Sequence, residues 1–239
     1  ENILSINRDH QHSYLGYVLS DRVVATNDIE KLCDQCQLIF PVIPSEIFRE
    51  VMKQFNPYLR PDHFLIHGTK GLYVEPTFFE NKQGTLRRNE VLTMSEIIEQ
   101  ETSVLRIGCI SGPNLSEEIM EGQPTATVVS SKFREVILAG KNALNTKVFR
   151  VFESTEIKGA ELAGTLKNII AIGSGILAGK GLGKNMQAML ITKGLSEIVH
   201  LGKSLDISPS IFLGTAGLGD VIATATSVKS RNFRFGKAI

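Results

Sequence analysis

Short apolar runs alternate with amphipathic segments along the first two thirds of the sequence. Six runs, rich in Val, Ile, Leu or Phe, have the length of single strands: residues 22–26, 37–41, 63–67, 105–110, 125–130 and 147–152. Between them, helical spacing of apolar residues predicts helices at 45–55, 94–102 and 131–142, and the first follows Pro44 with Ser45 as its expected N-cap. Strands separated by helices predict βαβ units, a mostly parallel sheet and therefore an α/β fold.

The pattern changes after Glu153. No convincing strand follows, and helical patterns run over 157–178 and 185–204. We therefore expect two domains, an α/β domain over residues 1–153 and an all-α domain over residues 154–239. Residues 73–93, which contain Pro, Gly and several Asn and Arg residues, are expected to form a surface excursion from the layered pattern.

Composition narrows the class of protein. The 26 Lys and Arg residues against 25 Asp and Glu residues give a formal charge of +1, which argues against a strongly cationic nucleic-acid binder. Three cysteines do not make a disulfide framework, so a reducing compartment such as the cytoplasm is expected. We expect neither an export signal nor a membrane span, because the most apolar stretch, residues 162–179, still contains Lys167.

Lys167 is the strongest candidate for chemistry. It is the only charged residue in the apolar segment that follows Glu161, and a buried ammonium group usually faces a cavity and has a lowered pKa, which suits a general base. Thr165 and Asn168 follow Glu161 at helical spacing as an adjacent polar stripe. The residues that share the face of Lys167 are small and leave room for a ligand: Ala163, Gly164, Ala171 and Ser174. The alternative is a lysine that extends from a helix edge into solvent.

A second group of candidates lies near the end of the chain. A glycine-rich turn precedes Asp220 and can deliver its carboxylate to a crowded place where it offsets the charge of a lysine, although the same pattern is a common helix N-cap. Ser230, Arg231 and Asn232 then open a helix, where a hydroxyl, a guanidinium and backbone N–H groups can converge on a phosphate. The alternative is the start of a basic, solvated helix.

Two loops at strand ends are also candidates, because open α/β sheets bind ligands at the carboxyl ends of their strands. The loop 111–114 follows the fourth predicted strand, and Lys70 follows the third, where it can reach an anionic substrate or point into solvent. Other motifs are weak. Cys33 and Cys36 have redox spacing but precede a strand, the five histidines show no metal-ligand spacing, and no glycine-rich dinucleotide motif follows a strand.

Four motifs together resemble the bacterial NAD(P)-dependent glycerol-3-phosphate dehydrogenase family: 109–126 (CISGPNLSEEIMEGQPTA), 159–171 (GAELAGTLKNIIA), 212–220 (FLGTAGLGD) and 230–232 (SRN). The resemblance implies a Rossmann-type N-terminal domain, a helical substrate domain and a site in the cleft between them. It implies an oxidoreductase that interconverts sn-glycerol 3-phosphate and dihydroxyacetone phosphate with NAD or NADP. The implied setting is glycerophospholipid synthesis in the cytoplasm by a homodimer.

The resemblance also implies roles for individual residues. Lys167 would accept the proton of the substrate's secondary hydroxyl, with Asp220 beside it. Further substrate contacts are implied for Lys70, Gly112, Asn114, Asn168, Ser230, Arg231 and Asn232, of which the last three would hold the phosphate. Cofactor contacts are implied for Pro44, Lys70, Ser116 and Arg231. The implied partners are a phosphorylated small molecule and a nicotinamide dinucleotide, with no nucleic acid, membrane or metal.

The family's pattern extends beyond this sequence at both ends. In the family, a strand and a glycine-rich phosphate-binding turn precede the region that matches Glu1, and further residues follow the region that matches Ile239. We therefore expect this sequence to lack the first βα unit and the end of the helical domain, and to bind a dinucleotide weakly. Two alternatives stay open: another two-domain hydroxyacid dehydrogenase, and a non-catalytic relative that binds a phosphorylated metabolite or a partner chain.

Overall fold

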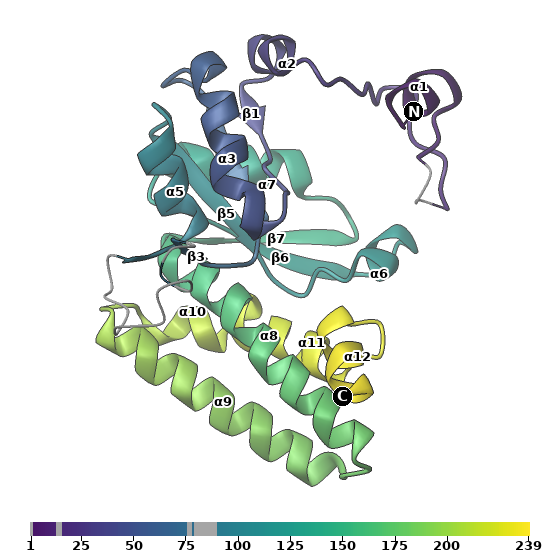
Figure 1. Cartoon of the computed structure of the whole chain (residues 1–239), viewed down its shortest axis with the longest axis vertical. Helices are drawn as coiled ribbons and strands as arrows, with labels where there is room; N and C mark the ends of the chain where they lie inside the picture. The colour runs from purple at the N-terminus through teal and green to yellow at the C-terminus, as the bar shows by residue number, and fades with distance from the viewer. Residues whose placement is uncertain (1, 13–15, 76–77, 79–89) are drawn as a thin grey trace.

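The computed structural model describes residues 2–12, 16–75, 78 and 90–239. An α/β half, which contains the sheet, lies above a helical half coloured green to yellow (Figure 1). The first helix, α1 (Asn2–Asp9), stands apart from the sheet and buries none of its residues. It is held to the following segment by a pair of hydrogen bonds between the Asn7 side chain and the backbone of Ala25.

The central sheet has five strands in the order β1-β2-β5-β6-β7. Their bounds are β1 (Leu38–Ile39), β2 (Phe64–His67), β5 (Arg106–Ser111), β6 (Thr125–Ser131) and β7 (Phe149–Ser154). Every neighbouring pair is parallel except β5 and β6. The mostly parallel sheet is therefore confirmed. The one antiparallel pair follows from its connection, which holds only the five-residue helix α6 (Ser116–Met120) and brings the chain back beside β5.

Helices cover the sheet in the α/β half. They are α2 (Ile29–Gln35), α3 (Ser45–Phe55) with the 3-10 turn η1 (Asn56–Tyr58), α5 (Met94–Glu101) and α7 (Arg134–Leu144). The strand predicted at 22–26 is wrong: that segment forms no ladder, and Val24 is exposed. The predicted cap of α3 is also wrong, because Pro44 occupies the N-cap position and Ser45 is the first helical residue. Helix α7 begins later than predicted because β6 continues to Ser131.

The excursion predicted at 73–93 lies mostly outside the described residues. Its two ends form a small antiparallel pair, β3 (Tyr73–Val74) with β4 (Val91–Leu92). Arg49 of α3 anchors the first end: its Nη1 atom lies 2.7 Å from Oε1 of Glu75, and its guanidinium stacks over the Tyr73 ring. The excursion therefore leaves and rejoins the α/β half at a fixed place.

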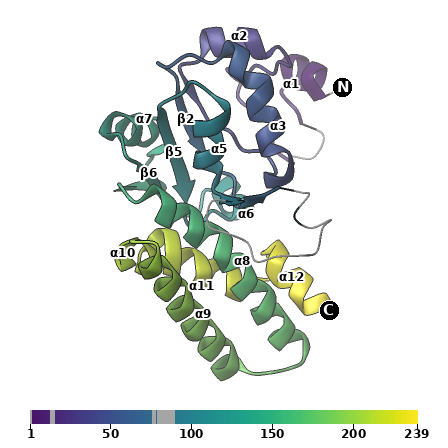
Figure 2. The same cartoon turned by 60° about the vertical axis from the view of Figure 1, so that its left-hand side comes forward.

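The helical half is built around α8 (Ile157–Gly179) and α9 (Lys184–Ser204), which run side by side (Figures 1 and 2). The remaining elements are α10 (Pro209–Leu213), the π-helical turn η3 (Thr215–Gly219), α11 (Asp220–Thr226) and α12 (Arg231–Ala238). Helix α8 is long and apolar enough to cross a membrane by length and composition, but here it packs against α9, α11, α12 and β5. At its crossing with α12, a Cβ on Gly175 would lie 2.1 Å from the Phe233 carbonyl oxygen, so only glycine permits this approach.

Helix α8 joins the two halves. Its first turns belong to the same hydrophobic core as α3 and α5, through buried residues such as Ala160, Phe48 and Ile97. Its later turns belong to the helical half, where Ile170 and Ala171 are buried. The middle of α8 therefore passes the junction of the two halves, and Lys167 lies on this part of the helix.

Candidate active site

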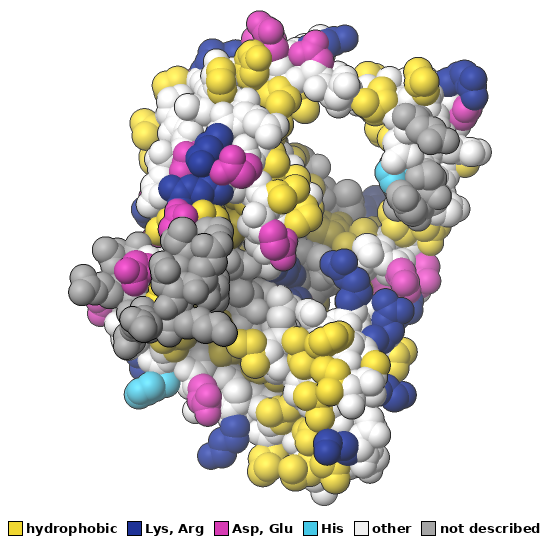
Figure 3. All heavy atoms as spheres, viewed as in Figure 1, with side chains coloured by type: hydrophobic (Ala, Val, Ile, Leu, Met, Phe, Trp, Pro, Cys, Tyr) yellow, Lys and Arg dark blue, Asp and Glu magenta, His cyan; other side chains and the backbone are white. Residues whose placement is uncertain are grey.

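Four segments that are distant in the sequence converge at this junction. They are the loop after β2, which carries Lys70, the carboxyl end of β5 at Gly112, the middle of α8 at Lys167, and the start of α11 at Asp220. On the face of the molecule seen in Figure 3, Lys and Arg side chains gather beside α6 and α12, where the surface between the two halves is recessed. The junction is therefore the place where sequence-predicted candidates from both halves meet.

Lys167 is buried and donates to two partners on α11. Its Nζ atom donates to Oδ1 of Asp220 and, at 2.8 Å, to the hydroxyl oxygen of Thr224. The Thr224 hydroxyl in turn donates to Oδ1 of Asp220 at 3.2 Å. Because Asp220 and Thr224 are four residues apart on one helix, both face Lys167. The side chain thus does not extend to solvent, which removes the alternative interpretation of this lysine.

A second ammonium group shares the same carboxylate. Nζ of Lys70 donates to Oδ2 of Asp220 at 2.8 Å and to the Gly112 carbonyl oxygen at 3.2 Å. The Lys70 side chain is about a quarter exposed (26%), whereas Asp220 is almost fully buried (1%). One buried carboxylate therefore faces two ammonium groups, one from each half of the molecule.

The environment lowers the pKa of Lys167 from 10.5 to about 7. Burial is the main cause, since it removes water from the charged form, and the nearby positive charge of Lys70 acts in the same direction. The Asp220 carboxylate opposes both effects but does not cancel them. At neutral pH, Lys167 therefore exists as a mixture of amine and ammonium, which is the state that a proton-transfer group requires.

The small residues on the Lys167 face do not leave the open space that the sequence predicted. The aliphatic stem of Lys70 lies over Gly164, where an added Cβ would be 3.6 Å from Cγ of Lys70 and 3.0 Å from Oγ of Ser111. Ser174 donates to the Ala225 carbonyl oxygen of α11 at 2.6 Å. At Gly164 and Ser174 the small side chains thus admit neighbouring protein groups, so the expectation of ligand space is wrong for these two positions.

The loop after β5 is shaped by Gly112. Its φ angle is +156°, and an added Cβ would lie 3.0 Å from Cα of Thr127 on the neighbouring strand. Asn114 donates from Nδ2 to Oγ1 of Thr127 at 3.0 Å, and that hydroxyl donates to the Ser111 carbonyl oxygen. This chain of bonds fixes the orientation of the Asn114 amide. Its Oδ1 atom is buried and accepts no hydrogen bond from a described residue, which leaves an acceptor without a donor at this point of the junction.

The predicted phosphate site at the start of α12 is only partly assembled. Oγ of Ser230 accepts from the Phe233 N–H at 3.3 Å and caps the helix. Asn232 donates from Nδ2 to Oδ1 of Asn168 at 2.7 Å, which ties α12 to α8. Arg231 is exposed and makes no ion pair with a described residue. Arg231 is therefore the member of this motif that is free to meet an anion.

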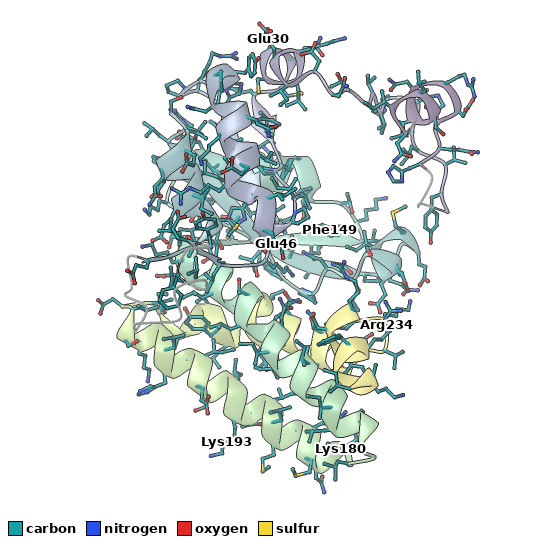
Figure 4. The ribbon with its side chains drawn as sticks, in the orientation of Figure 1. Glu30, Glu46, Phe149, Lys180, Lys193 and Arg234 are labelled. Carbon is teal, nitrogen blue, oxygen red and sulfur yellow. The ribbon has the colours of Figure 1, made fainter. Side chains whose placement is uncertain are left out.

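The helical half carries cations both beside the junction and far from it. Arg234 lies on α12 beside the junction, whereas Lys180 and Lys193 lie at the far end of the helical half (Figure 4). Lys229, just before α12, spans the junction, with its Nζ atom 3.5 Å from Oε1 of Glu121, which follows α6. Besides Lys70, positive charge at the junction is thus supplied by α12 and by Lys229.

Besides Lys70, the predicted cofactor contacts in the α/β half lie at helix starts. Pro44 is the N-cap residue of α3, and the α3 start meets the loop after β2 so closely that a Cβ on Gly71 would be 2.5 Å from Cβ of Ser45. Ser116 is exposed and begins α6, which follows the Gly112 loop. Neither residue contacts the pair of lysines directly in the described contacts.

Three residues of this region were not proposed from the sequence. Thr224 had a local signal, since it follows Asp220 at helical spacing. His67 and Ser95 had none: Nε2 of His67 lies 3.0 Å from Oε1 of Glu161, and Ser95 donates two hydrogen bonds to Glu161. These contacts join β2, α5 and α8, so only the packing of the three elements creates them.

Comparison with known protein families gives two matches that cover most of the chain. Residues 1–137 match the model described as NAD-dependent glycerol-3-phosphate dehydrogenase N-terminus. Residues 156–239 match the model described as NAD-dependent glycerol-3-phosphate dehydrogenase C-terminus. The two matches follow one another in the order of the α/β half and the helical half.

Individual relatives agree with the family models. Glycerol-3-phosphate dehydrogenase [NAD(P)+] of Saccharophagus degradans is 37% identical over 233 residues, which are 98% of this chain and 61% of the relative. The enzyme of the same name from Oceanobacillus iheyensis is 38% identical over 242 residues, covering 100% of this chain and 66% of the relative. A crystal structure of glycerol-3-phosphate dehydrogenase from Coxiella burnetii superposes with a TM-score of 0.87 at 30% identity, covering 99% of this chain and 69% of that one. The chain thus spans less than two thirds of the length of these two curated relatives.

Proposed function

The chain belongs to the NAD-dependent glycerol-3-phosphate dehydrogenase family, and on that premise we propose that its junction site interconverts sn-glycerol 3-phosphate and dihydroxyacetone phosphate with NAD or NADP. The observation that carries the proposal is the buried group of Lys167, Lys70 and Asp220. The ketone-reducing direction would supply sn-glycerol 3-phosphate, the glycerol backbone used for phospholipids, and the alcohol-oxidising direction would consume it. The match of both halves to one family favours this reaction over a binding-only role.

The bound dinucleotide supplies the hydride acceptor or donor. The residues present fit such a group in two respects. The buried Oδ1 atom of Asn114 lacks a hydrogen-bond donor among the described residues and suits an amide N–H such as that of a carboxamide. Cations beside the recess suit its phosphates. Pro44, Ser116, Lys70 and Arg231 are the residues that would contact it.

Lys167 supports proton transfer in both directions. Oxidation of a secondary alcohol requires loss of the hydroxyl proton, and the neutral amine of Lys167 can accept it. Reduction of the ketone requires delivery of a proton to the same oxygen, and the ammonium form can donate it. A pKa of about 7 populates both forms at neutral pH, so neither direction is blocked by the protonation state.

Asp220 and Thr224 orient the transferring nitrogen. Asp220 accepts from both lysines and Thr224 accepts from Lys167, so the Nζ atom is held at a fixed point on α8. A fixed position of this nitrogen lowers the entropy cost of reaching the transition state. The partly exposed Lys70 would contact the substrate from the recess, beside Lys167.

The substrate phosphate is held at the start of α12. The exposed guanidinium of Arg231 can form two charge-assisted hydrogen bonds to phosphate oxygens. Asn232 and Asn168 bond to each other and would fix the distance between this anchor and Lys167. Gly112, Asn114 and Ser230 complete the proposed substrate contacts. Binding of the phosphate would therefore position the reacting carbon of the substrate.

The purified chain tests the proposal directly. Absorbance of the reduced nicotinamide is followed with dihydroxyacetone phosphate, and Lys167→Met serves as the inactive reference. Turnover with this substrate, lost in Lys167→Met, supports the proposal. Turnover only with a carboxylate substrate that is insensitive to phosphate would indicate another hydroxyacid dehydrogenase, and phosphate-ester binding without turnover would indicate a binding protein.

The same proposal includes a cytoplasmic homodimer, as the family resemblance implies. Sedimentation equilibrium of the purified chain checks the oligomeric state. A single species at the monomer mass of 26.3 kDa would contradict the dimer.

A further inference from the structure

A second buried polar cluster, formed by Glu161, His67 and Ser95, lies near the junction. The Glu161 side chain, 2% exposed, accepts hydrogen bonds from the backbone N–H of Ser95 at 2.8 Å and from its hydroxyl at 2.6 Å. Nε2 of His67 lies 3.0 Å from Oε1 of the same carboxylate. These residues come from α8, α5 and the last position of β2. None of them contacts Lys167, so the proposed chemistry does not use them.

This cluster is costly in terms of stability. A buried carboxylate and imidazole lose their hydration, and a hydrophobic replacement of similar volume is often no less stable. Neither ring nitrogen of His67 makes a well-aligned hydrogen bond with a described residue, and its ring packs edge-on against Phe48 at 5.9 Å between centroids. The remaining polar contact of His67 is its approach to Glu161. We therefore expect this cluster to have a role other than stabilising the fold.

The geometry of the chain around His67 suggests that role. Lys70 follows His67 by three residues, and Gly164 follows Glu161 by three residues, which is close to one turn of α8. His67 meets Glu161, and the stem of Lys70 lies over Gly164. The end of β2 and the loop after it therefore contact α8 at two points, one turn apart.

We propose that His67 and Glu161 are positioning residues that hold the β2 end against α8 and thereby keep the ammonium group of Lys70 at Asp220. This inference concerns the same site as the proposed function and rests on that function for its activity readout only. Glu161 is itself anchored by the start of α5, which is fixed by a capping box between Thr93 and Glu96. The helix thus provides a rigid support for the carboxylate.

The proposal has a consequence that a purely structural role lacks. Lys70 is one of the causes that lower the pKa of Lys167. If the β2 end moves away from α8, Lys70 leaves Asp220, and Lys167 then loses a neighbouring positive charge while keeping the carboxylate to itself. The pKa of Lys167 must then rise. A loss of stability alone would not change this pKa.

Among the described residues, few charged groups surround Glu161 and Lys167. Glu161 faces His67 from β2 and the Ser95 N–H from α5, and it contributes to raising the pKa of the buried Cys109 thiol on β5. Lys167 faces Lys70 from the loop after β2 and Asp220 from α11. Glu161 is not among the groups that shift the pKa of Lys167. We therefore expect its replacement to act on Lys167 through the position of Lys70.

The test measures the titration of Lys167 without relying on turnover. The chain is labelled with 13C at the lysine Cε atoms, and the Lys167 resonance is assigned from its loss in Lys167→Met. Glu161→Gln keeps the shape of the side chain and one acceptor oxygen for the backbone N–H of Ser95, but replaces the oxygen that accepts from the Ser95 hydroxyl and removes the carboxylate beside His67. We expect the Lys167 pKa to rise by about one unit, the lower end of what a like charge at close range produces.

A matched control perturbs the same helices without touching β2. Nζ of Lys158 on α8 lies 2.8 Å from Oε1 of Glu96 on α5, so Lys158→Ala weakens the α5–α8 contact at the surface. We expect this variant to leave the Lys167 titration unchanged. His67→Phe, which fits the aromatic contact with Phe48, is expected to give the same upward shift as Glu161→Gln.

The outcomes separate this inference from the proposed function. A folded Glu161→Gln or His67→Phe variant with the Lys167 titration of the original chain overturns the positioning role. If neither variant folds, Ser95→Ala removes a single hydrogen bond to Glu161 and is judged by the same criterion. An original chain that titrates near pH 7 but does not turn over dihydroxyacetone phosphate contradicts the proposed function and leaves the positioning result valid. Where turnover is present, the variants should also raise KM more than they lower kcat.

Discussion

Lys70 and Lys167 approach one buried carboxylate from opposite halves of the molecule, each through a different oxygen of Asp220. Two positive charges around one negative charge leave the site with a net positive charge when both lysines are protonated. That excess favours an anionic ligand and favours loss of a proton from the more buried of the two ammonium groups. The electrostatics of binding and of proton transfer are thus set by the same three side chains.

Replacing Lys167 by Met removes the proposed proton-transfer group and preserves a long, flexible side chain. We expect kcat to fall about 10²–10⁴-fold, the usual contribution of general acid–base catalysis. KM for dihydroxyacetone phosphate should change little, because the phosphate contacts lie on α12. Steady-state kinetics checks this, with circular dichroism as the control for folding. A variant that retains more than half of the original kcat would contradict the assignment.

The pH dependence of turnover follows from the pKa of Lys167, which is about 7. Alcohol oxidation needs the amine and should rise as the pH increases through 7, whereas ketone reduction needs the ammonium form and should fall over the same range. In Lys70→Ala the depressing charge is absent, so both transitions should move to higher pH. Rate profiles in the two directions measure this. Identical profiles in the original chain and Lys70→Ala would refute the coupling.

Thermal stability should depend on pH through the same group. Lys167 has a pKa of about 7 in the fold and an ordinary value of 10.5, so the unfolded chain binds more protons between these values. Stability from this group therefore rises with pH across that window, and its burial is most unfavourable below pH 7. Lys167→Met removes this cost of burying a charged group. Compared with the original chain, the variant should therefore gain more stability at pH 6 than at pH 10. Differential scanning calorimetry at the two pH values measures the difference, and an equal change in Tm at both would count against it.

Gly164 should be required for the packing around Ser111 and Lys70. In Gly164→Ala, the new Cβ would lie 3.0 Å from Oγ of Ser111, which must shift, and 3.6 Å from Cγ of Lys70, which is an ordinary contact that crowds the lysine stem. We expect kcat/KM to fall about 3–10-fold, since sub-ångström displacements at a catalytic site are costly. Gly173→Ala on the same helix is the control: its Cβ would meet only the side-chain end of Leu190, which can turn away. Equal losses in the two variants would show a general effect on α8.

Arg231 should govern affinity for the phosphate. We expect Arg231→Ala to raise KM about 10–100-fold, the effect of losing one or two charge-assisted hydrogen bonds. Arg234→Ala, an exposed cation of the same helix, should change KM much less. Inhibition by inorganic phosphate provides a second measurement, because its inhibition constant should rise in parallel with KM only for Arg231. If Arg231→Ala and Arg234→Ala raised KM equally, the phosphate would be attracted by the general positive charge of α12 and would not be bound by Arg231 in particular.

The sequence predicted the elements whose signals are local. Helix α3 begins at Ser45 and ends at Phe55 as expected, because its apolar spacing and the preceding proline are both contained in that segment. Helices α8 and α9 are within one residue of their predicted starts for the same reason. The strand predicted at 22–26 failed because two valines in a row indicate a strand only where a neighbouring strand is available, and that is not a local property.

By itself, the sequence identified Lys167 as an unusual lysine and Asp220 as a carboxylate delivered by a tight turn, because both signals lie within single segments. Only the tertiary structure decided that these two groups meet, that Lys70 completes the site and fills the space over Gly164, and that His67 meets Glu161 beneath it. Each of these contacts joins elements far apart in the chain. Such contacts depend on how a strand end, a loop and three helices pack together, and this packing is a property of the whole core.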